Sequence, residues 1–237
     1  MTRSLTTTLA WGGDGAAHLR GLMARMGDDA FVAPSALPGW SRAHVLSHVA
    51  LQADGMINLL TWARTGTPTP AYASVEQRDA DITAGALRAP ATIREDVISS
   101  SDRLAKVVRE MPAQAWAVQV ANPQGVEFPA IDIPWLRARE MWIHAIDLDV
   151  GASFADLPTP MLTELLTEVA AALSSKPGCP SLRLEAATGT WTVGGPDGAS
   201  VVTGTAPELA AWLLGRSRGR ELRCNAGRTL PIVPRWL

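Results

Sequence analysis

Two residues in the segment LRAREMWIHAIDL, Glu140 and His144, are four positions apart. If this segment is a helix, both side chains project from one face, about 6 Å apart along the helix axis. A carboxylate and an imidazole in this arrangement can bind one metal ion. The same spacing is also that of an ordinary helix-stabilising contact, so the pair alone does not establish a metal site.

A further ligand would have to come from another segment, and AHVLSHVA offers two histidines. His44 and His48 are themselves four residues apart and could form a competing pair, so spacing does not choose between them. Two imidazoles and one carboxylate are typical of catalytic zinc, because this set leaves coordination positions open for water or substrate. The same ligands also suit iron or nickel. We therefore expect a divalent metal, with Zn²⁺ as the first choice.

Other residues that could take part in the chemistry are few. Asp147, one turn beyond His144, could orient its imidazole as a hydrogen-bond acceptor or could cap the helix end. Cys179 and Cys224 match no metal-binding or redox spacing, and we interpret both as small buried side chains. Any thiol chemistry would then need an external thiol. The nine tryptophans are interpreted as core residues.

Four segments with helical periodicity must position the candidate ligands. They run from about Thr6 to Gly27, from the N-cap Ser41 to Gly66, from Pro90 to Met111, and from about Asp132 to Gly151. The connection 67–86 could hold a helical turn at SVEQRDADI. The segment AWAVQVANPQGVEFPAID is expected to be irregular or extended, with a turn near residues 122–125. Four antiparallel helices form a complete bundle.

The sequence pattern changes after Gly151. A helix is expected from about Thr159 to Ser174, followed by the short strands SLRLEA and TWTVGG, a PDG turn and the strand ASVVTG. APELAAWLLGR then reads as an amphipathic helix and RELRCN as another strand. We predict an α+β protein with a helical domain over residues 1–151 and a smaller α+β domain over residues 152–237.

Composition and charge exclude several classes of protein. The chain has 47% hydrophobic and 19% charged residues, which is enough apolar material for a packed core. A net charge of -2 without a dense Lys/Arg cluster argues against nucleic-acid binding. No apolar run approaches membrane-spanning length, and the N-terminus does not resemble a signal peptide. We expect a cytoplasmic monomer without a membrane partner.

The segments GWSRAHVLSHVA, GTPTPAYAS with EQRDADI, LRAREMWIHAIDL and the terminal PRWL together resemble the mycothiol-dependent maleylpyruvate isomerases. The resemblance covers essentially the whole chain. It implies a DinB-like four-helix bundle over residues 1–151 and a sterol-carrier-like α/β domain over residues 152–237. It also implies His48, Glu140 and His144 as metal ligands.

The resemblance further implies a functional arginine in a segment similar to G-R-G, which Arg216 occupies here. Ser217 replaces the glycine that follows, and Arg218 is close, so the working arginine could be either one. The implied partners are a small-molecule substrate and a low-molecular-weight thiol, mycothiol. The metal would lower the thiol pKa, and the thiolate would add to the cis double bond of maleylpyruvate. Rotation and elimination would then give fumarylpyruvate, a step of gentisate-type aromatic catabolism.

Two other functions fit the same residues. A mycothiol S-transferase would conjugate the thiol to an electrophile and release the adduct. A non-catalytic protein would bind metal or thiol without turnover. Stoichiometric consumption of thiol would identify the transferase, and retained metal without any reaction would identify the binding protein.

Overall fold

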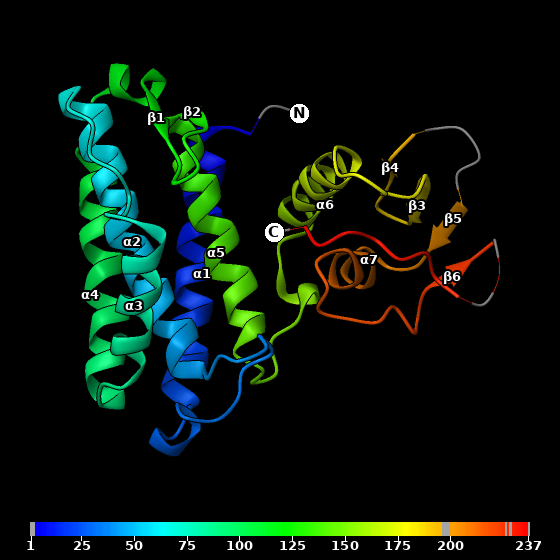
Figure 1. The fold of residues 1–237 in the computed structure, drawn as a ribbon, viewed down its shortest axis with the longest axis horizontal. Helices are drawn as coiled ribbons and strands as arrows, with labels where there is room; N and C mark the ends of the chain where they lie inside the picture. Colours follow the sequence, from blue (N-terminus) through cyan, green and yellow to red (C-terminus); the bar gives the residue numbers. More distant parts are fainter. Residues whose placement is uncertain (1–2, 196–199, 226, 228, 237) are drawn as a thin grey trace. The chain divides into compact units, whose positions relative to one another are not determined.

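The computed structural model of the chain describes residues 3–195, 200–225, 227 and 229–236. Contacts within the chain divide it into two compact units, Met1–Ala152 and Ser153–Leu237. Helices make up most of the first unit, and a small sheet with two helices makes up most of the second (Figure 1). The α+β class predicted from the sequence is thus confirmed. Among the described residues, no helix is long and apolar enough to cross a membrane.

The first unit contains the four predicted helices and one additional helix. Their bounds are α1 (Leu5–Arg25), α2 (Arg42–Thr65), α3 (Val75–Ala86), α4 (Pro90–Arg109) and α5 (Ile133–Asp147). Helix α1 packs along α5, and α2 packs between α4 and α3 while also contacting α5 (Figure 1). Short 3-10 turns lie at Asp28–Ala30, Ala113–Ala117 and Ala130–Asp132, and a hairpin is formed by β1 (Gln119–Ala121) and β2 (Glu127–Pro129).

Capping residues explain where the ligand-bearing helices begin and end. Helix α2 begins after Ser41, whose Oγ accepts a hydrogen bond from the backbone of His44, and it ends at Gly66 in a left-handed conformation with φ of 75°. Both ends agree with the sequence prediction. Helix α5 ends at Asp147, one turn before the predicted end at Gly151. The chain turns there because Asp149 has a positive φ of 54°, which a continuing helix does not allow.

Helix α3 is the main difference from the prediction, which expected at most a helical turn in the connection 67–86. The helix has twelve residues, and Ser74 caps it by accepting a hydrogen bond from the backbone of Gln77. Its sequence has few apolar residues at helical spacing, and only Ile82, Gly85 and Ala86 are buried. It packs closely on α2 at Gly85, where an added Cβ would lie 2.9 Å from Cβ of Ser47. Contact with α2 therefore compensates for the weak apolar face of α3.

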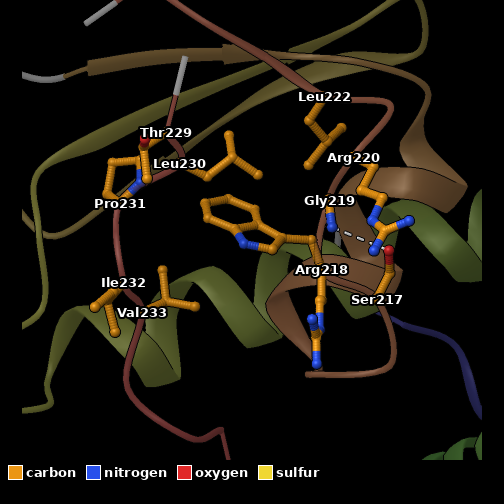
Figure 2. Close-up of a pocket in the computed structure, with 11 residues that line it drawn as sticks. Ser217, Arg218, Gly219, Arg220, Leu222, Thr229, Leu230, Pro231, Ile232 and Val233 are labelled. Carbon is orange, nitrogen blue, oxygen red and sulfur yellow. Dashed lines mark hydrogen bonds between the residues drawn. The ribbon is translucent and has the colours of Figure 1, made fainter. Parts of the chain in front are cut away.

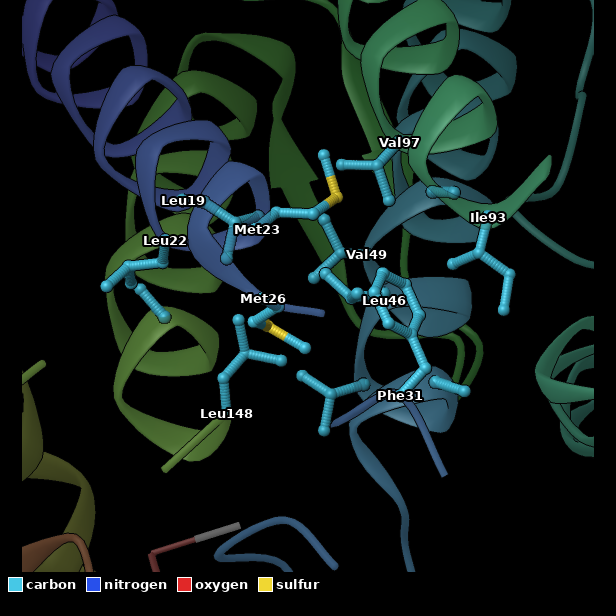
Figure 3. Close-up of a cluster of buried hydrophobic side chains, with 14 of the residues drawn as sticks. Leu19, Leu22, Met23, Met26, Phe31, Leu46, Val49, Ile93, Val97 and Leu148 are labelled. Atoms are coloured by element: carbon cyan, nitrogen blue, oxygen red, sulfur yellow. The ribbon is translucent and has the colours of Figure 1, made fainter. Parts of the chain in front are cut away.

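Apolar side chains from α1, α2, α4 and α5 form the core of the first unit around the ligand-bearing helices. Figure 3 shows the cluster that lies toward the C-terminal end of α1, with Leu19, Met23, Leu46, Val49 and Val97 among its members. A second cluster surrounds the other half of α2, including Leu60 and Leu104. The two clusters fix the helices that carry the candidate ligands.

In the part of the second unit that the structure describes, a four-stranded sheet packs with two helices. The elements are α6 (Thr159–Ser174), β3 (Leu182–Ala186), β4 (Gly189–Val193), β5 (Ser200–Thr203), α7 (Ala206–Leu213) and β6 (Arg223–Cys224), preceded by a 3-10 turn at Phe154–Asp156. The strand order is β4-β3-β5-β6, and only β3 and β5 are parallel. Helix α6 packs on β4 and α7 (Figure 1). Each predicted strand and helix has a counterpart, whereas the predicted PDG turn lies outside the described residues.

Gly15 sets the distance between α1 and α5, and this contact generates a prediction. A Cβ at Gly15 would lie 2.8 Å from Cβ of Met141, whereas nothing lies within 4 Å of a Cβ at Gly13. Gly15→Ala should therefore lower the free energy of unfolding by about 1–3 kcal/mol through overpacking. Gly13→Ala should raise it by about 0.5–1 kcal/mol through helix propensity. Urea denaturation followed by circular dichroism checks both, and equal effects of the two substitutions would contradict the close contact.

Candidate metal centre

The three predicted ligands converge between α2 and α5. His48 lies on α2, and Glu140 and His144 lie one turn apart on α5. Glu140 Oε2 is 2.9 Å from His48 Nε2 and 3.0 Å from His144 Nε2. One ligand atom from each residue lies within 4.8 Å of the others. Glu140 and His144 of α5 thus form a three-residue cluster with the imidazole that α2 contributes.

His44, the alternative to His48, occupies a different position. Its Nδ1 lies 2.7 Å from Ser41 Oγ and 3.3 Å from the backbone nitrogen of Ser41, which makes it part of the capping box of α2. Its ring also stacks on Trp40, with 6.2 Å between ring centroids. The pair His44 and His48 therefore divides into one capping residue and one member of the cluster.

Hydrogen bonds to two carboxylates determine the charge of His144 in this arrangement. Its Nε2 faces Glu140, and its Nδ1 lies 3.0 Å from Oδ2 of Asp147, which is fully buried. Carboxylate oxygens accept hydrogen bonds, so both ring nitrogens donate and His144 is an imidazolium. Burial alone would lower the pKa of His144, but the bonds to Asp147 and Glu140 outweigh burial and raise the pKa to about 9.

The pKa values of the two other members of the cluster are both lowered, but for different reasons. Burial alone would raise the pKa of Glu140, but hydrogen bonds from His144 and His48 hold it well below its ordinary value, so Glu140 is a carboxylate. Burial lowers the pKa of His48, and the hydrogen bond to Glu140 opposes this while the charges of His144 and Arg78 add to it. His48 is therefore the neutral imidazole of the pair.

Arg78, on α3, contacts the outer side of the cluster. Its Nη2 lies 3.2 Å from Nδ1 of His48, and its Nη1 lies 2.7 Å from Oδ1 of Asp79. Its guanidinium carbon lies 5.8 Å from the ring centroid of Tyr72. Burial raises the pKa of Tyr72, and the charge of Arg78 opposes this shift while that of Glu140 adds to it. Sequence spacing gave no signal for Arg78, because its place depends on the unpredicted helix α3.

A second arginine is buried beside Glu140 on α5. Arg137 donates to the backbone oxygen of Val49 at 2.9 Å, to Oε1 of Gln52 at 2.6 Å and to Oγ of Ser101 at 3.0 Å. Burial lowers its pKa to about 10, and the charge of Glu140 opposes this shift. The sequence shows that Arg137 is three residues before Glu140, but it does not predict that Arg137 is buried. Arg137 ties α5 to α2 and α4 and supplies positive charge near the carboxylate.

The chemistry of this donor set fits a divalent ion. Ligand atoms 2.0–2.1 Å from a tetrahedral zinc ion are roughly 3.3 Å from one another, close to the separations of both imidazole nitrogens from Glu140 Oε2. Asp147 accepts a hydrogen bond from Nδ1 of His144, as carboxylates commonly do behind metal-binding histidines. Of the two alternatives for Asp147, the structure favours orientation of the imidazole over capping.

Arg216 and Arg218 belong to the second unit, just after α7. The Nη1 of Arg216 donates to the backbone oxygen of Leu214 at 2.7 Å. Arg218 and Arg220 instead line a pocket of about 510 Å³ whose apolar wall includes Trp212 (Figure 2). Arg216 is half-buried, whereas Arg218 is exposed at this pocket.

The two cysteines differ from the sequence-based interpretation. Cys179 and Cys224 are free thiols and only half-buried, rather than buried. Desolvation raises the pKa of the Cys179 thiol, which makes it a weak nucleophile.

Comparison with known proteins gives two kinds of match. The family model for the mycothiol maleylpyruvate isomerase N-terminal domain matches residues 13–149. Two crystal structures match over 100% of this chain and 100% of their own chains, each with a TM-score of 0.93. One is a mycothiol-dependent maleylpyruvate isomerase at 31% identity, and the other, at 30% identity, is a histidine-to-alanine mutant of a mycothiol-dependent maleylpyruvate isomerase. No curated protein sequence matches the chain significantly.

The raised pKa of His144 predicts how stability depends on pH after metal is removed with a chelator. The folded pKa of about 9 exceeds the unfolded value of 6.5, so the stabilisation is complete below pH 6.5 and is lost as the pH rises through 9. The free energy of unfolding should fall in this window by at most about 1.4 kcal/mol per pH unit. Urea denaturation from pH 6 to pH 10 measures this slope. His144→Gln serves as control and should flatten the slope, and an identical slope in both proteins would contradict the assignment.

Proposed function

Because the chain belongs to the mycothiol maleylpyruvate isomerase family, we propose that it converts maleylpyruvate to fumarylpyruvate with mycothiol as cofactor. The observation that carries this proposal is the full-length match to a mycothiol-dependent maleylpyruvate isomerase, combined with the convergence of two imidazoles and one carboxylate between α2 and α5. The reaction would be a step of aromatic-acid breakdown. It needs a reduced thiol, which favours the cytoplasm as its compartment. We propose that the chain acts as a monomer, since one chain contains all the residues assigned below.

In this proposal His48, Glu140 and His144 hold a divalent ion, with Zn²⁺ as the first choice. Bound there, the ion would lower the pKa of the mycothiol thiol, so that a thiolate is available at neutral pH. Asp147 keeps the imidazole of His144 oriented through its Nδ1. Arg137 holds α5 in place through its bonds to α2 and α4, which keeps Glu140 at its distance from His48.

The covalent steps balance without any other reactant. When bound, mycothiol would supply a thiolate that adds to one carbon of the cis double bond, with the electron pair taken up by the conjugated keto group. The former double bond would then be single and free to rotate. Return of the electron pair would re-form the double bond in the trans geometry and break the carbon–sulfur bond. The thiolate would be regenerated, so mycothiol would not be consumed.

An arginine has a clear role in this sequence of steps. The substrate carries carboxylates and develops enolate charge, and a guanidinium binds such oxygens through paired hydrogen bonds. We assign this role to Arg216, with Arg218 as the alternative in the same segment.

The metal assignment predicts which histidine is required. His48→Ala and Glu140→Gln should lower bound metal and reduce mycothiol-dependent kcat/KM for maleylpyruvate at least about 100-fold, because each removes a proposed ligand. His44→Ala is the matched control, since it removes the neighbouring histidine of α2 and should keep both metal and activity. Chelation should abolish activity, and added Zn²⁺ should restore it. Isomerisation without mycothiol, or stoichiometric consumption of mycothiol, would overturn the proposed reaction.

The arginine assignment predicts a loss of turnover without a loss of metal. Arg216→Ala should lower kcat/KM by roughly 10- to 1000-fold, as expected when one charged donor to a developing oxyanion is removed. Metal content, measured by atomic absorption, should stay at the wild-type level. Arg218→Ala in parallel identifies the working residue. Full activity in Arg216→Ala with strong loss in Arg218→Ala would move the role to Arg218.

A further inference from the structure

The contact between Arg78 and His48 is suited to one protonation pattern of the imidazole. A guanidinium only donates hydrogen bonds, so His48 Nδ1, 3.2 Å from Arg78 Nη2, must accept. The proton of this neutral imidazole then lies on Nε2, which donates to Glu140 Oε2 at 2.9 Å. Arg78 and Glu140 together fix His48 as the Nε2–H tautomer.

A metal ion at the proposed site would reverse this pattern. Binding through Nε2 uses the lone pair of that nitrogen, so a neutral His48 must carry its proton on Nδ1. Nδ1–H and the Arg78 guanidinium are both donors and repel each other. His144 has no such conflict, because its Nδ1 already donates to a carboxylate of Asp147. The two imidazoles therefore differ. Asp147, the partner of His144 Nδ1, suits metal binding, whereas Arg78, the partner of His48 Nδ1, opposes it.

We propose that Arg78 is the carboxylate-binding residue of the metal centre, and that it becomes available when metal on His48 breaks the contact between Arg78 and His48. This inference rests on the proposed function and names the part of the substrate that the first unit would recognise, an anionic carboxylate. Metal and carboxylate then favour each other's binding, since a carboxylate occupies the guanidinium that would otherwise oppose the ion.

The surroundings of Arg78 support this role. Its side chain is 26% exposed, so a solute can reach it, and Asp79 engages Nη1 while Nη2 is the nitrogen that His48 would release. The guanidinium lies near the ring of Tyr72, which limits its movement. Arg137, another cation near Glu140, already donates to three oxygens and is 7% exposed. Arg78 is therefore better placed than Arg137 to exchange its partner for a substrate oxygen.

Metal affinity without any carboxylate is the first test. Arg78→Met removes the opposing donor, and Arg78→Gln also offers an acceptor oxygen to Nδ1–H. Both variants should bind Zn²⁺ about tenfold more tightly than the wild type in chelator-competition titrations, the scale on which residues behind metal ligands act. Arg88→Met is the control, because Arg88 follows α3 and pairs with Asp96 at 2.7 Å. It should leave the affinity for Zn²⁺ unchanged.

The second test measures the coupling to carboxylate. Succinate, an unreactive dicarboxylate, should raise the Zn²⁺ affinity of the wild type and of Arg88→Met, and should have no effect on either Arg78 variant. An Arg78 variant that binds Zn²⁺ like the wild type, or that still responds to succinate, would overturn the inference. That result would leave the proposed function intact if the wild type isomerises maleylpyruvate. A wild type that binds no metal would instead overturn the proposed function itself.

Discussion

The first unit depends on the hydrogen bonds that stabilise one partly buried carboxylate. Glu140 lies between two helices, where an isolated negative charge would cost several kcal/mol. It is stabilised because an imidazolium and a neutral imidazole both donate to one of its oxygens. One donor comes from α2 and the other from the next turn of α5, so moving α2 out of its place would leave Glu140 with only the donor from its own helix. The bundle and the candidate metal site are therefore stabilised by the same contacts.

Positive charge around this carboxylate is divided between two different environments. Arg137 is enclosed and its hydrogen bonds are made to the backbone and to neutral side chains, so it acts as a fixed support. Arg78 is partly exposed and contacts an imidazole whose hydrogen-bonding role would change on binding of an ion. Enclosed groups keep the helices in register, and exposed groups remain able to exchange partners. A binding site that must be both rigid and accessible needs both an enclosed cation, such as Arg137, and a partly exposed one, such as Arg78.

The sequence predicts much of this arrangement, and the exceptions have physical causes. Caps such as Ser41 and Gly66 act locally, so the ends of α2 could be predicted from a few residues. The spacing of Glu140 and His144 likewise predicts their shared face. The choice between His44 and His48 could not be made from spacing, because it depends on which ring turns back to Ser41. Helix α3 and its Arg78 were missed because tertiary contact, and not periodicity, stabilises that helix.

The close approach of α1 to α5 has a consequence for which ion the protein could select. A Cβ at Gly15 would meet Met141 and Trp142, the two residues directly after Glu140. The indole of Trp142 also donates to the backbone oxygen of Trp11 at 2.9 Å. These contacts fix the rotation of α5 about its own axis. A carboxylate about 6 Å from that axis moves by about 2 Å when the helix rotates by about 20°. Such a shift is comparable to the length of a metal–ligand bond. A helix without any ligand of its own would therefore set the coordination geometry of an ion held by the proposed ligands, and with it the preference among divalent metals.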